Sequence, residues 1–72
     1  PDYGEGDDIF AYQNGGNVIV RGEGELQVFD VMGRFVMSRE VRGEEAFSMP
    51  AGGVYIFRLL GETLRTQKIV VK

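Results

Sequence analysis

The sequence predicts an all-β domain, an antiparallel sandwich of about seven short strands with an immunoglobulin-like arrangement. Short apolar runs rich in β-branched and aromatic residues alternate with turn-forming separators along most of the chain. No window of about ten residues or more repeats its apolar positions with the 3.6-residue period of a helix. Short strands joined by closely spaced turns are typical of antiparallel sandwiches.

Each expected strand is an apolar run that ends at a separator. In chain order the separators read QNGG, GEGE, MG, RGEE, PAGG and GET, and all are interpreted as turns because they are rich in residues that favour turns. The seven expected strands are Ile9–Tyr12, Asn17–Arg21, Leu26–Val31, Arg34–Val41, Ala46–Met49, Val54–Leu60 and Leu64–Val71.

Alternation within these runs predicts which side chains are buried, since successive residues of a strand point to opposite faces. In the last run Ile69 and Val71 share one face. Lys68, Val70 and Lys72 share the other, so both lysine heads are expected in solvent. The residues expected in the core are Val18, Val20, Leu26, Val28, Tyr55, Phe57, Leu59, Ile69 and Val71.

Length and charge limit the organisation of the chain. Its 72 residues suffice for one domain, and without cysteine no disulfide can add stability. Residues 1–8, PDYGEGDD, are expected to form a flexible acidic linker, and residues 9–72 the domain. Because the chain starts at Pro1, it is expected to be a piece of a longer protein. The net charge of −3 argues against nucleic acid as the partner.

The residue types argue against an enzyme. There is no histidine or cysteine to activate a nucleophile. The acidic pairs Asp7–Asp8 and Glu44–Glu45 are adjacent, and neighbours in a strand point to opposite faces, so neither forms a catalytic dyad. A calcium site from Glu5, Asp7 and Asp8 is conceivable, but its spacing matches no calcium loop. No metal, cofactor or catalytic residue is therefore expected.

Three stretches in fixed order are more specific than the general strand pattern. LQVFDVMGRFV begins at Leu26, MPAGGVYIFRL begins at Met49, and TQKIVVK ends the sequence at Lys72. In the first stretch Gly33 can supply the positive φ of a tight turn. Asp30 can accept hydrogen bonds from the amides of that turn or pair with Arg34.

This order resembles the C-terminal sorting domain of the Bacteroidetes type IX secretion system. Members show an apolar strand that runs into Asp-x-x-Gly-Arg, then Pro-x-Gly-x-Tyr, then a terminal Lys-apolar-apolar-apolar-Lys. The resemblance covers residues 9–72. Two departures stand out: Tyr12-Gln13-Asn14-Gly15 lacks the prolines of the family's opening segment, and the second motif has one additional glycine. The additional glycine is expected to lengthen the turn or form a bulge without moving Tyr55 off the core face.

The resemblance implies a role in secretion. Such domains direct a parent cargo protein from the periplasm across the outer membrane. The type IX translocon recognises the domain, and an outer-membrane sortase then removes it and attaches the cargo to the cell surface. The residues that the motifs carry over as signal or partner-recognition positions are Gly33, Arg34, Gly52, Gly53, Tyr55, Lys68, Ile69, Val70, Val71 and Lys72.

Two alternatives stay open at this stage. Lys68 and Lys72 are either part of a strand that only closes the core or residues that a partner reads. The domain itself is either a sorting signal or an immunoglobulin-like binding or adhesion module on a secreted protein. Weak dimerisation through an edge strand is a further expectation, since unpaired strand edges bind other strands.

Overall fold

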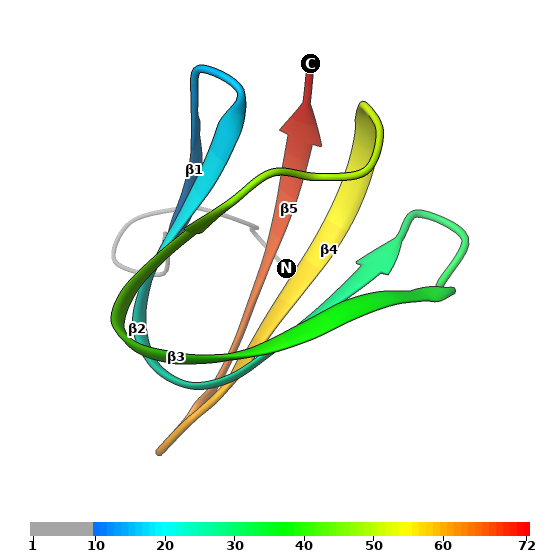
Figure 1. Ribbon diagram of the computed structural model, residues 1–72. Coiled ribbons are helices and arrows are strands. Elements are labelled where there is room, and N and C mark those ends of the chain that lie inside the picture. Colours follow the sequence, from blue (N-terminus) through cyan, green and yellow to red (C-terminus); the bar gives the residue numbers. More distant parts are fainter. Residues whose placement is uncertain (1–9) are drawn as a thin grey trace.

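The computed structural model describes residues 10–72, which form one curled antiparallel sheet (Figure 1). The prediction of an all-β antiparallel fold is confirmed, but the expected count of seven strands is wrong: the described residues form five, in a half-barrel. The expected linker at residues 1–8 lies outside the described residues. The strands are β1 (Ala11–Asn14), β2 (Asn17–Asp30), β3 (Phe35–Phe47), β4 (Gly53–Leu60) and β5 (Leu64–Val71).

The count is lower because β2 and β3 each join two of the predicted strands. The separators at 22–25 and 42–45 do not reverse the chain. Instead, Gly22 pairs with Gly43 and Gly24 pairs with Val41, so the β2–β3 ladder runs through both separators. Gly22, Gly24 and Gly43 have φ values of 143°, 137° and 97°, which side chains disfavour. β2 and β3 bend together (Figure 1), and the glycines permit the backbone conformation of the bend.

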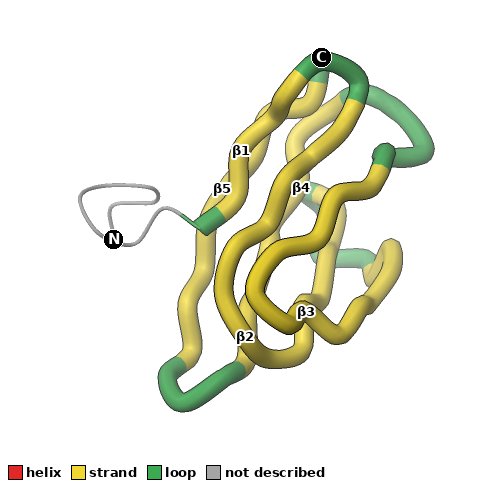
Figure 2. Tube along the Cα trace, turned by 60° about the vertical axis from the view of Figure 1, so that its left-hand side comes forward, coloured by secondary structure: helices red, strands yellow, loops and turns green. Residues whose placement is uncertain are grey.

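β2 is the central strand and changes partner at this bend. Along one edge it pairs with β3. Along its other edge, residues 17–20 pair with β1 and residues 25–30 pair with β4, which in turn pairs with β5. The curl brings β1 beside β5 (Figure 2). The expected two-layer sandwich is therefore replaced by a single sheet folded over its own core.

Glycine is required where β2 passes the β4–β5 turn. A Cβ atom on Gly24 would overlap the carbonyl oxygen of Leu60, and one on Gly61 would overlap the carbonyl oxygen of Glu23. Both neighbours are backbone atoms, which cannot move aside as a flexible side chain would. The GEGE separator, predicted to be a turn, thus allows β2 to pass close to the β4–β5 turn.

The core lies on the concave face of the sheet. Eight of the nine predicted core residues are buried, and Val71 is half-buried against them. Phe57 lies at the centre, with no exposed surface and its ring stacked on Phe47 at 6.2 Å between centroids. The buried apolar residues that the alternation did not identify in advance are Phe10, Ala11, Ile19, Val41 and Phe47.

Candidate recognition site

The three sequence motifs meet at one end of the sheet. Asp30 at the end of β2 pairs with Tyr55 of β4, and Tyr55 pairs with Ile69 of β5. One residue along, Phe29 pairs with Ile56 and Ile56 with Lys68. We call this region, residues 29–35, 52–56 and 68–72, the motif end. Segments far apart in the sequence therefore form one continuous surface.

The first motif forms the β2–β3 turn, where Asp30 acts as the predicted acceptor. Its carboxylate accepts hydrogen bonds from the backbone N–H groups of Met32 and Arg34, each at 2.9 Å, and from Arg34 Nε at 2.9 Å. Gly33 has φ of 88°, and its N–H donates to the Asp30 carbonyl oxygen. The Arg34 amide, the Arg34 guanidinium and the Met32 amide lower the pKa of Asp30, although burial opposes them.

Arg34 is held by this turn but remains available to a partner. Its side chain is 78% exposed while that of Asp30 is 23% exposed, so the ion pair lies at the edge of the surface. Exposed ion pairs of this kind contribute little to stability. The turn amides already stabilise the turn, and the guanidinium adds a cation at a defined position.

The second motif fixes the loop that leads into β4. The Tyr55 hydroxyl donates a 2.7 Å hydrogen bond to the Ala51 carbonyl oxygen across the loop. Gly53 has φ of 146° and pairs with Val71, and a Cβ on Gly52 would lie 3.1 Å from the Val71 carbonyl oxygen. Tyr55 is buried, as expected despite the additional glycine. The glycines and Tyr55 thus position this loop against β5.

The third motif occupies the end of β5, and its side chains divide as the alternation predicts. Ile69 is buried, Val71 is half-buried, and Val70 is 53% exposed. The Lys68 and Lys72 side chains are exposed. Gln13 of β1 holds the backbone of Lys72, because its Oε1 accepts the Lys72 N–H at 3.2 Å and its Nε2 donates to the Lys72 carbonyl oxygen at 3.4 Å.

Sequence reasoning missed Gln67, which links β5 to β1. It is 6% exposed, and its Oε1 accepts the N–H groups of Phe10 at 2.8 Å and Ala11 at 3.1 Å. Its Nε2 donates to the Ala11 carbonyl oxygen at 2.7 Å. A polar residue on the apolar face of the last strand was the available signal, because a buried amide requires hydrogen-bond partners.

The carboxylates of the described residues do not gather into a metal site. No group of three or more candidate metal ligands occurs among residues 10–72, and Glu5, Asp7 and Asp8 lie outside them. Glu44 forms an ion pair with Arg21 at 3.1 Å, as a surface carboxylate does. No helix in this part of the chain is long and apolar enough to cross a membrane.

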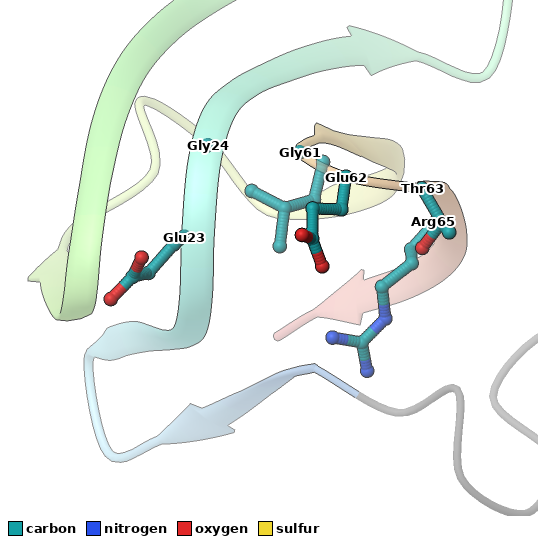
Figure 3. A pocket seen from close by; sticks show the side chains of 7 residues that line it. Glu23, Gly24, Gly61, Glu62, Thr63 and Arg65 are labelled. Carbon is teal, nitrogen blue, oxygen red and sulfur yellow. The ribbon is translucent and has the colours of Figure 1, made fainter.

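A hollow lies away from the motif end, beside the β4–β5 turn (Figure 3). It encloses about 650 Å³ and opens broadly to solvent. Glu23, Glu62 and Arg65 contribute its charged groups, and the Arg65 guanidinium also lies over the Phe10 ring at 5.2 Å. A shallow, open hollow with mixed charges lacks the enclosed apolar walls of a small-molecule site.

The chain was compared with protein-family models, with curated proteins and with solved structures, and no match was found in any of the three. The function is therefore inferred from the residues and their arrangement.

Proposed function

We propose that this chain is a C-terminal sorting domain, which directs a parent cargo protein across the outer membrane through the type IX secretion system. The observation that supports this is the meeting of all three motifs at the motif end. A hairpin, a loop and a strand end could each occur in any β-domain. Their contact across β2, β4 and β5 gives the motif order a common location.

The motif residues divide between folding and recognition. Gly33, Gly52, Gly53 and Tyr55 shape the turn and loop, and Ile69 anchors β5 in the core. Arg34, Lys68, Val70 and Lys72 have exposed side chains. A solvent-facing lysine at either end of an apolar run adds little to the core, so we assign these four residues to recognition by the translocon. The outer-membrane sortase then acts in or just upstream of residues 1–8.

A second candidate function is the binding or adhesion module of a secreted protein. The observation in its favour is the apolar surface near the β2–β3 turn, where Met32 is 77% exposed and Phe35 is 61% exposed. Clustered exposed apolar groups mark interaction sites. An adhesion module would bind its partner through this surface after secretion. A sorting domain would bind the secretion machinery during secretion.

The test follows a reporter that carries an N-terminal export signal and this chain at its C-terminus, in a Bacteroidetes host with an active type IX system. We expect the wild-type fusion at the cell surface and the Lys68→Ala/Lys72→Ala variant in the periplasm. Exposed substitutions of this kind change stability by no more than about 0.5 kcal/mol, so melting curves should coincide.

Arg21→Ala/Arg42→Ala is the matched control. Both arginines are exposed cations away from the motif end, and this variant should reach the surface. If the wild-type fusion stays in the periplasm, the proposed function is wrong. If both double variants reach the surface at wild-type levels, the translocon does not recognise the two lysines.

A further inference from the structure

The outer, convex face of the motif end carries a patch of apolar side chains. Residues directly opposite each other in antiparallel strands share a face, so the pairing of Phe35 with Phe29, and of Phe29 with Ile56, places all three together. Val54 and Val70 form the neighbouring pair. We call these five residues the outer-face patch. It crosses four strands, from β3 to β5, on the side opposite the core.

The patch is partly exposed, and its aromatic side chains contact each other. Phe35 is 61% exposed and Val70 is 53% exposed, while Phe29, Val54 and Ile56 are half-buried. The Phe29 and Phe35 rings meet edge to face with centroids 6.0 Å apart. These neighbours restrict the rotamers of the aromatic side chains, so less conformational entropy is lost when a partner covers them.

Cations border this patch. Lys68 pairs directly with Ile56, and the Arg58 guanidinium lies 6.0 Å from the centroid of the Phe29 ring. The cross-strand row that contains Arg58 also contains Gln27, Ser38 and Thr66, which are uncharged. In the next row on this face Glu25 pairs with Glu40 and with Leu60, so these carboxylates lie one row further from the motif end. The patch is thus locally cationic on a chain whose net charge is −3.

We propose that the outer-face patch binds an acidic protein partner, whose apolar side chains cover Phe29 and Phe35 and whose carboxylates meet Lys68 and Arg58. An apolar centre with a polar rim is the usual composition of a protein interface, in which aromatic and arginine side chains are enriched. The inference rests on the proposed recognition role of the motif end and adds the chemistry of the partner.

Two other occupants fit less well. An anionic membrane would attract the patch but repel the chain as a whole, because of its net charge of −3. A strand added to the outer edge of β3 would meet alternating charges, including Glu40 and Arg42, and the bend at Gly43. Charged side chains and bends are the features that protect strand edges from pairing.

The experiment is an NMR titration of the isotope-labelled 72-residue chain with a random copolymer of glutamate and tyrosine, an acidic polypeptide with apolar side chains. Polyglutamate and vesicles of phosphatidylcholine with phosphatidylserine are the comparison probes. We expect shift changes at the amides of Phe29, Phe35, Ile56, Lys68 and Val70. Binding should weaken as salt rises, because salt screens the charge pairs.

Matched variants test both parts of the patch. Lys68→Glu and Phe35→Ser should each weaken copolymer binding roughly tenfold, whereas Arg42→Glu, an equal charge reversal on β3, should change it less than twofold. Absent copolymer binding, shifts elsewhere on the sheet, equal binding of polyglutamate, or binding of vesicles alone would each overturn the inference. Reporter export is measured separately, so failure of the proposed function can be distinguished from failure of this inference.

Discussion

Replacing Gln67 with leucine tests how the curled sheet is closed. Leucine has a similar volume but cannot form the three hydrogen bonds that Gln67 makes to Phe10 and Ala11. These two residues are 3% and 1% exposed, so two N–H groups and one carbonyl oxygen would lose their partners in a buried place. Each unsatisfied group costs about 1–3 kcal/mol.

The expected loss of stability is limited by how easily β1 detaches. β1 has only four residues, so the strand can separate and expose its polar groups to water. Separation exposes Phe10, whose burial contributes about 1.5–3 kcal/mol. We therefore expect Gln67→Leu to lower the free energy of unfolding by about 2–4 kcal/mol, a large part of the stability of so small a domain.

Urea denaturation followed by circular dichroism measures this loss, and hydrogen exchange at the amides of Ala11 and Tyr12 locates it. Gln13→Leu is the matched control, since Gln13 of β1 also forms hydrogen bonds to the end of the chain, at Lys72, but these bonds are exposed. The free energy of unfolding of this variant should fall by less than about 1 kcal/mol. Wild-type stability and wild-type exchange in Gln67→Leu would refute the role of this side chain in closing the sheet.

Three further predictions concern stability. Phe57→Ala removes a fully buried ring and should cost about 3–5 kcal/mol in urea denaturation; an unchanged midpoint would contradict its central place in the core. Gly24→Ala should cost about 1–3 kcal/mol from backbone strain alone and more from overlap with Leu60, whereas Gly16→Ala, with no atom within 4 Å, should be nearly silent. Because folding lowers the pKa of Asp30 below its ordinary 3.8, its ionised form stabilises the fold above that pH, and this contribution is lost as the pH falls through the lowered value. The stability difference between wild type and Asp30→Asn should therefore narrow below about pH 4; a constant difference down to pH 2 would show that the carboxylate charge has no role.

Local sequence patterns were sufficient to predict which faces of the last strands are buried and how the β2–β3 turn is formed. Alternation in the last two strands identified Tyr55, Phe57, Leu59 and Ile69 as core residues, because one buried face imposes a period of two. The Asp30 turn was also predictable, since its partners lie within four residues of it along the chain.

Long-range contacts explain what the sequence did not reveal. GEGE has turn composition, but Gly22 and Gly24 instead bend β2 so that it can pass Gly61, a contact between distant residues. Gln67 became recognisable only once β1 lay beside β5. The three motifs of the candidate site could be identified from the sequence. That they lie side by side could not, because it depends on the pairing of β2 with β4.

The central claim is that the secretion machinery recognises the motif end, so that the end of β5 has a role beyond closing the fold. It is tested most directly by adding a few polar residues after Lys72 and measuring how much cargo reaches the cell surface. Lys72 is exposed, so the extension should enter solvent and leave the melting temperature unchanged. We expect the extended protein to accumulate in the periplasm. Normal surface delivery at an unchanged melting temperature would contradict the claim and reduce the end of β5 to a structural strand.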